Sequence, residues 1–200
     1  MADYPATRAA ALALGEEQRL IRQGYDFLDE KRMLLAGEIM RQLDEWRGLR
    51  DAYSEANERA REALGAAITD HGLEGLQVHP VDETSAVEIT HVRHDFLGVI
   101  LIEVTSPGEA RRAKAAYASS ADHCAAAFRE LAALAHRLAA NSGNLFRLAD
   151  EYARTERRAS ALENVLLPEI ADALKTIEER LEEVDQEEAI RVRMAGRHAG

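Results

Sequence analysis

Histidines are the residues whose type and spacing first suggest chemistry in this sequence. The stretch "HVRH" places His91 and His94 three residues apart, and His71 and His79 precede them. A zinc site needs more ligands than these two, and no glutamate stands beside them at zinc-like spacing. The surrounding residues predict a β-strand, in which positions three apart point to opposite faces. We therefore expect solvated or partner-facing histidines, with no metal site and no bound cofactor.

Carboxylates and glycines give no stronger indication of catalysis. Acidic runs such as "EERLEEVDQEE", which begins at Glu178, are typical of a solvated helix face. The segments "GEEQ", "GLEG" and "NSGN" lack the spacing and the lysine of a phosphate-binding loop. No serine, histidine and aspartate are arranged as a nucleophilic triad would require. The sequence thus predicts a chain without catalytic residues, which is not itself an enzyme.

Arginines give the one charge pattern that suggests a partner. They gather in the second half of the chain at Arg147, Arg154, Arg157 and Arg158, and again in the tail "RVRMAGR". Two interpretations are open. The first is pairing within the helix with Glu151 and Glu156, worth a few tenths of a kcal/mol per pair. The second is docking against acidic loops of a surrounding partner.

Composition excludes several classes of partner. The 200 residues carry 36 acidic and 25 basic side chains, a formal net charge of -11. Such a chain is repelled by nucleic-acid phosphates and by anionic lipid. Cys124 is the only cysteine, so no intrachain disulfide forms. With no signal-peptide pattern and no apolar run of membrane-spanning length, we expect a cytoplasmic protein.

A heptad pattern predicts one long helix that ends near Gly72 and is capped by Asp3 or Thr7. The apolar steps alternate between four and three, with gaps at Arg32 and Gln42. The apolar positions are Ile21, Tyr25, Leu28, Leu35, Ile39, Trp46, Leu49, Tyr53, Ala56, Ala60 and Ala63. At ~1.5 Å per residue, the helix would be on the order of 100 Å long.

The middle of the chain is rich in β-branched residues and predicts a hairpin. Val87 and Ile89 indicate one strand, and residues 99–104 indicate the other. Their separation is too long for a two-residue turn, so we expect an irregular connection. After it, "SPGE" at residues 106–109 has the serine, proline and glutamate of a helix start.

A second apolar stripe follows in the C-terminal half. Its members are Leu131, Leu134, Leu138, Leu145, Leu148, Tyr152, Ala159, Leu162, Leu166, Ile170, Ile177, Leu181 and Val184. The stripe persists across "NSGN", residues 141–144, which either bends or breaks the helix. It also persists across Pro168, although proline inside a helix costs about 3 kcal/mol or more. We expect Pro168 to set a local bend or an offset of the helix.

The two stripes can bury each other. The sequence therefore predicts an all-α dominated fold, a long antiparallel two-helix coiled coil with a small β-hairpin-containing middle segment. The expected organisation is an N-terminal long helix over residues 1–72, a β-rich middle over 73–105 and a C-terminal helical half over 106–200.

Motifs at both ends resemble the D subunit of V-type and A-type rotary ATPases. "PATRAAALAL" and "IRQGYDFLDEKRMLL" are similar to the family's N-terminal signature, at Pro5, Thr7, Arg8, Phe27, Leu28, Lys31 and Arg32. "ERRASALENVLLPEI" is similar to its Arg-Arg-x-Asn-Ala-Leu-Glu-x-x-x-x-Pro element, at Arg157, Arg158, Ala161, Leu162, Glu163 and Pro168. "DFLGVILIEV" is similar to its Met-Gly-Val stretch, at Leu97, Gly98 and Val99. Ser160 stands where the family usually has asparagine.

This resemblance implies a central rotor shaft that couples ATP hydrolysis or synthesis to ion translocation through a membrane ring. The terminal helices would enter a ring of A and B subunits on the cytoplasmic face of the membrane. The middle and the lower coiled coil would bind the F subunit and meet the C (or d) subunit, which links to the membrane rotor ring. The expected partner contacts are Arg154, Arg157, Arg158, Glu163, Arg191 and Arg193.

Three other interpretations fit parts of the sequence. A rotor-like coiled coil of an F-type gamma subunit or a flagellar export stalk would share the paired helices. It would lack the Leu-Glu-x-x-x-x-Pro element and the β-rich middle. A coiled-coil scaffold unrelated to ATP would be a stable self-dimer without affinity for A and B subunits. A histidine-based metal enzyme would bind stoichiometric zinc.

Overall fold

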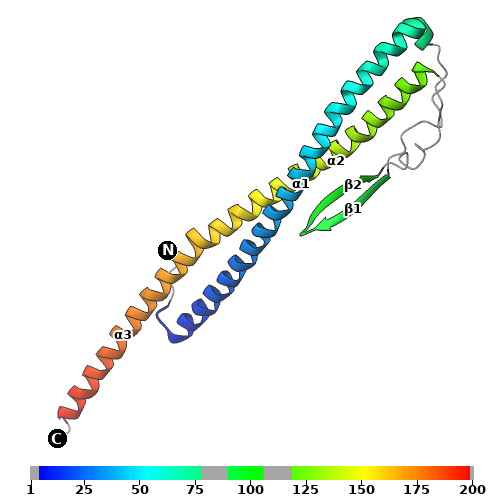
Figure 1. Ribbon diagram of the computed structural model, residues 1–200. Helices are drawn as coiled ribbons and strands as arrows, with labels where there is room; N and C mark the ends of the chain where they lie inside the picture. Colours follow the sequence, from blue (N-terminus) through cyan, green and yellow to red (C-terminus); the bar gives the residue numbers. More distant parts are fainter. Residues whose placement is uncertain (1–4, 78–89, 106–118, 199–200) are drawn as a thin grey trace. The chain divides into compact units, whose positions relative to one another are not determined.

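The computed structural model describes residues 5–77, 90–105 and 119–198 (Figure 1). The prediction of a mainly helical chain with a small antiparallel sheet in its middle is confirmed. The chain divides into two compact units. We call residues 1–34 with 153–200 the terminal unit, and residues 35–152 the central unit. In the described part of the chain, no helix has an apolar stretch long enough to cross a membrane.

Helix α1 (Arg8–Gln77) begins after Thr7, one of the two caps that the sequence suggests; the other, Asp3, lies outside the described residues. The Thr7 hydroxyl accepts a hydrogen bond from the Ala10 N–H at 3.1 Å, which satisfies one of the first free amides. The backbone leaves the helical conformation at Gly72, where φ is 68° and ψ is 165°. A short helical segment then completes α1.

Helix α2 (Ser120–Ala161) continues through "NSGN" without a break, so this motif does not end the helix. Its start is capped by Ser119, whose Oγ accepts a hydrogen bond from the Asp122 N–H at 3.2 Å. A five-residue π-helix, η3 (Leu162–Leu166), and helix α3 (Leu167–His198) follow directly. The "SPGE" motif lies outside the described residues.

The terminal unit is an antiparallel pair of helices. Arg8 on α1 pairs with Asp185 on α3 at 3.1 Å, whereas Arg32, further along α1, pairs with Glu156 on α2 at 2.6 Å. Residue numbers therefore rise along α1 as they fall along the partner helix, so the two helices are antiparallel. The core of this unit contains Leu14, Ile170 and Ile177, which are buried, packed against Ile21, Ala173, Leu174 and Leu181.

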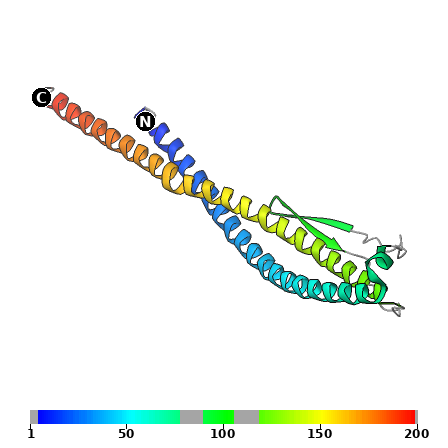
Figure 2. The ribbon, with the colours of Figure 1, turned by 90° about the horizontal axis from the view of Figure 1, so that it is seen from above.

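The central unit is antiparallel as well, and Figures 1 and 2 both show α1 and α2 side by side within it. Gln42 contacts Asn141 at 2.6 Å and Arg59 contacts Glu130 at 3.3 Å, in reversed order along the two helices. We call the face along which two paired helices bury their apolar stripes the seam. Toward the end of α1 the seam consists of small residues, all of them buried: Ala56, Ala60, Ala63 and Ala67.

The π-helix explains how α2 and α3 accommodate Pro168. Leu162 and Ile170 both face the seam but stand eight residues apart, one more than a heptad. The extra residue widens one turn, in which the Leu167 N–H donates to the Leu162 carbonyl five residues earlier. The half-buried Leu167, not Leu166 as the sequence predicted, therefore continues the seam.

We expect the chain to fold, and to be more stable, when this extra residue is deleted. Deleting Val165 together with Pro168→Ala restores a seven-residue step and a complete set of α-helical bonds. The melting temperature of the chain, followed by circular dichroism, should rise by a few degrees, about what 1 kcal/mol confers on a domain of this size. Deletion of the exposed Asp172 is the matched control, because it moves Ile177 and Leu181 off the seam. Equal destabilisation by both deletions would refute this account of the π-helix.

The hairpin consists of β1 (Thr90–Phe96) and β2 (Val99–Thr105), joined in seven consecutive antiparallel pairs. Only Leu97 and Gly98 connect the strands, and both have positive φ, 53° and 86°. Two positive φ angles fit the type I′ turn that matches the twist of a hairpin. The prediction of a long, irregular connection was therefore wrong.

The error arose because the β-branched pattern placed the first strand too early. Val87 and Ile89 lie outside the described residues, whereas β1 runs through "HVRHDF" to Phe96 and leaves only two residues before β2. A type I′ turn usually begins with asparagine or glycine, so "LG" gave no signal for one.

Leu97 is the strained residue of this turn. A residue with a Cβ in the left-handed region costs about 1–2 kcal/mol, whereas asparagine tolerates it better. We expect Leu97→Asn to slow hydrogen exchange of the hairpin amides by about two- to fivefold, a gain of up to ~1 kcal/mol. Leu97→Ala is the control and should give no such gain, because alanine keeps the Cβ. A slowing of the same size with alanine would contradict the explanation by strain.

Candidate functional site

The arginine patch of the terminal unit lies at the end of α2. Arg157 and Arg158 are exposed, and among the described residues neither has a carboxylate within ion-pairing distance. Arg154 is also exposed, although it is engaged in an interaction of its own. Two neighbouring guanidinium groups thus present positive charge to solvent in a strongly acidic chain.

Glu156 does not serve as the helix-internal partner that one interpretation gave it. Its carboxylate accepts a hydrogen bond at 2.6 Å from Arg32 of α1. Arg32 also donates to Asp29 on its own helix. The bond to Glu156 is the main cause of a raised pKa of the Arg32 guanidinium. The gap at Arg32 in the first apolar stripe is therefore a polar layer that fixes which residues face each other.

Arg147 does not belong to the patch either. It lies in the central unit, where its Nη2 donates to the side-chain oxygen of Asn144 at 2.7 Å. The sequence grouped it with the patch because it stands seven residues before Arg154 on the same helix. The structure instead places its guanidinium in the hydrogen-bond network that holds the hairpin.

Glu163 is exposed in the π-helix and has a partner within the chain. The Tyr25 hydroxyl donates a hydrogen bond to it, and burial followed by the charge of Glu163 raises the pKa of Tyr25. Leu162 packs beside Gly24, where a Cβ would lie 3.8 Å from the Leu162 Cδ1. Glu163 and Leu162 thus join η3 to α1, and their first role is structural.

The two family-like motifs meet across the coiled coil. The Arg32–Glu156 bond joins residues 124 positions apart and brings the end of the N-terminal motif to the start of the C-terminal one. Most other motif residues have structural roles: Thr7 caps α1, Arg8 pairs with Asp185, Gly98 forms the turn and Pro168 follows the π-helix. Pro5 accepts a hydrogen bond from the Thr7 N–H, and Lys31 is engaged in an interaction.

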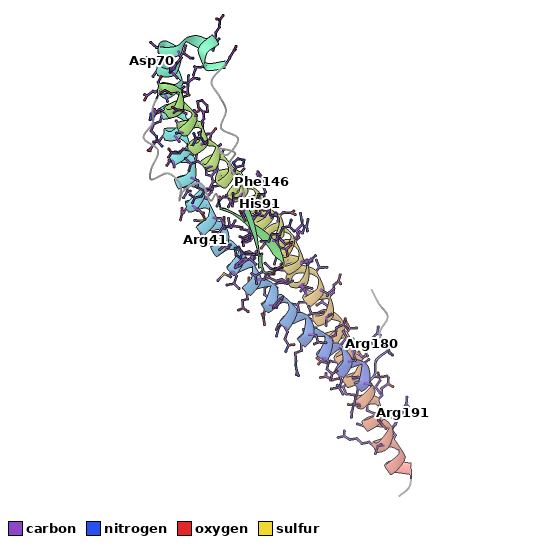
Figure 3. All side chains as sticks on the ribbon, turned by 90° about the vertical axis from the view of Figure 1, so that its right-hand side faces the viewer. Arg41, Asp70, His91, Phe146, Arg180 and Arg191 are labelled. Atoms are coloured by element: carbon purple, nitrogen blue, oxygen red, sulfur yellow. The ribbon has the colours of Figure 1, made fainter. Side chains whose placement is uncertain are left out.

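The end of α3 continues beyond its partner. Asp185 already contacts the first residue of α1, so the turns after it have no α1 residues beside them, as Figure 1 shows. Ile190, Val192 and Met194 are each more than half exposed there. Arg191, labelled in Figure 3, pairs with Glu187 at 3.4 Å, and Arg193 is exposed.

A second apolar stripe on α1, which was not predicted from the sequence, lies outside the seam. We call it the outer stripe: Leu12, Leu20, Phe27, Met33 and Leu34, which are 49–73% exposed. Leu20, Phe27 and Leu34 follow one another at intervals of seven residues. This heptad spacing is visible in the sequence, but the prediction considered only one apolar stripe on this helix. Exposed apolar side chains in such a row usually mark a surface that another protein covers.

The central unit carries a different kind of site, a clamp that holds the hairpin. Asn144 is buried, and its side-chain amide bonds both backbone groups of Ile102 on β2, the N–H at 2.8 Å and the carbonyl at 2.9 Å. Below it, Val99 and Leu101 pack on Leu35 and Leu148. The hairpin is therefore attached to both helices.

The other residues of "NSGN" contribute to the same region. Asn141 donates to Gln42 inside the seam, which explains the second gap in the first apolar stripe. Ser142 accepts a hydrogen bond from the Trp46 indole at 3.0 Å. These contacts between α1 and α2 are polar, so they specify the register more than they add stability.

A groove of about 740 Å³ lies between the hairpin and the two helices. Charged side chains of both signs line it: Glu38, Arg41, Glu45, His94, Glu103 and Arg137. The bond from Arg41, labelled in Figure 3, holds the pKa of Glu38 below its ordinary value, and His94 contacts Glu103 at 3.1 Å. Among the described residues, no group of three or more histidine, cysteine or acidic side chains could hold a metal ion.

Comparisons with known proteins give matches along nearly the whole chain. A family model described as the D subunit of ATP synthase matches residues 10–197. The chain is 30% identical to the D subunit of a V-type ATP synthase from Thermotoga neapolitana over 192 residues, 94% of each chain. It is 32% identical to the D subunit of an A-type ATP synthase from Pyrococcus abyssi over 193 residues, 94% of this chain and 90% of that one. The A-type D subunit of Methanosarcina mazei is 27% identical over 197 residues, 96% of this chain and 94% of that one.

Proposed function

Because this chain belongs to the family of ATP synthase D subunits, components of rotary ATPases, we propose that it is the central rotor shaft of such a complex. The shaft couples ATP hydrolysis or synthesis in a ring of A and B subunits to ion translocation through a membrane ring. The chain contributes no catalytic residue and no cofactor. It lies on the cytoplasmic face of the membrane as a peripheral subunit.

The observation that carries this proposal is the surface of the terminal unit. Its seam is closed by the α1–α3 core, yet the outer stripe and the end of α3 expose apolar side chains on other faces. Arg157 and Arg158 add positive charge without a partner among the described residues. A surface that is apolar and locally basic suits the inside of a surrounding ring with acidic loops.

The proposed mechanism is conformational. A ring subunit that binds ATP and one that has released it present different surfaces to the shaft, so each state favours a different orientation of the terminal unit. The orientation shifts by the difference in contact free energy between these states. The faces of the terminal unit must differ from one another for this to work, and the outer stripe on α1 and the arginines on α2 provide that difference. The π-helix before Pro168 offsets the seam of α3 and so adds to the difference between the faces.

The central unit is assigned to the remaining partners. We place the F subunit and the C (or d) subunit on it, since its hairpin and groove carry polar and charged side chains. The terminal unit is left to the A and B subunits. The proposed contact surface of the terminal unit for the A and B subunits consists of Arg154, Arg157, Arg158, Glu163, Arg191 and Arg193.

Stoichiometry tests this proposal. The tagged chain is co-expressed with the A, B and F subunits of the same organism, and the mass of the purified complex is measured. One copy of this chain per three A and three B subunits is expected, because only an axial component has that ratio in such a ring. A chain that elutes alone or as a self-dimer would instead support a scaffold unrelated to ATP.

A further inference from the structure

The two edges of the hairpin differ in a way that follows from the Asn144 clamp. Residues opposite each other in an antiparallel pair point their backbone groups either both inward or both outward. The N–H and carbonyl of Ile102 bond to Asn144, so they point away from β1. Its partner Arg93 therefore also points its backbone groups outward, on the free side of β1.

The alternation along a strand extends this result to neighbouring positions. His91 and Asp95 stand two residues from Arg93, so their N–H and carbonyl groups share the outer edge of β1. Phe96 and Val99 then form the hydrogen-bonded pair that closes the two-residue turn, as a type I′ hairpin requires. In the described part of the chain, no hydrogen bond satisfies the outer backbone groups of these three residues.

This edge has only part of the usual protection. Proteins commonly blunt edge strands with proline, bulges or charged side chains; β1 has the charged Arg93 and Asp95, but it has no proline and pairs through seven positions without a bulge. Six of its seven residues are exposed. The strand is nevertheless well anchored, because Phe96 packs on the core that contains Leu35 and Leu148. A fixed, open edge of this kind is a template for another strand.

The side chains on the edge indicate the charge of its occupant. Arg93 stands in the centre with His91 on one side, and the Asp95 carboxylate on the other side already accepts the Gly98 N–H at 3.2 Å. A segment with a carboxylate beside Arg93 would gain an ion pair across the strands. A second copy of β1, paired antiparallel about Arg93, would instead place two arginines opposite each other.

We propose that β1 binds an extended, acidic segment of a neighbouring subunit of the rotary complex, which adds to the hairpin as a third strand. This inference depends on the proposed function, because the neighbouring subunit is present only in that complex. The backbone of His91, Arg93 and Asp95 provides the hydrogen bonds of the added strand, and the Arg93 guanidinium selects its carboxylate.

Hydrogen–deuterium exchange with residue resolution tests the proposal, on the isolated chain and on the complete complex. The mass of the complex is determined first, which separates failure of the proposed function from failure of this inference. Assembly is expected to slow exchange of the His91, Arg93 and Asp95 amides at least tenfold. The Val92 and His94 amides, which face β2 in both samples, should change much less. Unchanged exchange of the three outer amides in a complex that contains the chain would overturn the proposal.

Two variants at one position add a second test. Arg93→Pro removes the outer N–H but none of the bonds between β1 and β2, and edge strands tolerate proline. It should abolish the protection of His91 and Asp95, whereas Arg93→Glu, which keeps the N–H, should weaken it by charge repulsion. The Leu101 amide reports whether the hairpin itself persists in each variant. Protection that survives both substitutions in a folded hairpin would overturn the proposal. So would concentration-dependent protection in the isolated chain, which indicates a second copy as the occupant.

Discussion

Replacing both Arg157 and Arg158 with glutamate is expected to lower ATP-driven ion transport by the assembled complex at least tenfold. These side chains are exposed at the end of α2 and, among the described residues, have no carboxylate within ion-pairing distance. Reversal turns attraction to acidic groups of the ring into repulsion, and like charges brought together at an interface cost several kcal/mol. The fold should be unaffected, because neither residue belongs to the core of the terminal unit.

The matched control is the same charge change in the central unit. Arg61→Glu with Arg129→Glu also reverses two exposed arginines, so the net charge of the chain changes equally. Ion transport and ATP hydrolysis are measured side by side, which separates uncoupling from loss of the complex. Transport at the level of the control in the Arg157/Arg158 double variant would show that these arginines do not contact the ring.

Asn144→Ala is expected to release the hairpin from α2. The substitution removes both hydrogen bonds to Ile102 and leaves a backbone N–H and a carbonyl without partners, at about 1–3 kcal/mol each. A total of about 2–6 kcal/mol corresponds to a roughly 30- to 25,000-fold larger equilibrium constant for opening of the hairpin. The measurement is hydrogen exchange of the Leu101 amide, which faces β1.

Asn164→Ala serves as the control for this prediction. Asn164 is exposed in the π-helix, and its side chain bonds only the Ser160 hydroxyl among the contacts of the described residues. Its loss should leave exchange in the hairpin within twofold of the wild type. If Asn144→Ala also stayed within twofold, the apolar contacts of Val99 and Leu101 would suffice to hold the hairpin.

The seam of the coiled coil was predictable because heptad spacing is local. Leu35, Leu49, Leu148 and Ile177 stand where the pattern placed them and are buried. Register was harder to predict, since it depends on contacts between distant residues. The gaps at Arg32 and Gln42 were visible in the sequence, but their partners Glu156 and Asn141 were not.

The π-helix and the hairpin turn show two further limits. Pro168 indicated an irregularity near Leu166. The sequence did not show that one extra residue is inserted into the helix there, and this residue changes which leucine faces the seam. The insertion is recognised only from the packing, in which Leu162 and Ile170 face the same seam eight residues apart. The turn at Leu97 and Gly98 was missed because leucine is an unfavourable residue at a positive φ.

The interaction surfaces were only partly predictable. Exposed arginines at 157 and 158 were identified from charge alone, whereas the outer stripe was missed because exposed apolar residues look like core in a sequence. The role of "NSGN" could not be read either, since Asn144 bonds the backbone of a strand 42 residues away.

Rotation of the chain inside the assembled complex tests the central claim most directly. The A and B ring is fixed to a surface and a bead is attached through Asp70→Cys, at an exposed position of the central unit labelled in Figure 3. Labelling is selective, because burial shields the native Cys124 and raises the pKa of its thiol. A shaft predicts that ATP drives the bead around in one direction, with three pauses in each turn. A bead that stays fixed while the same complexes hydrolyse ATP would contradict the assignment.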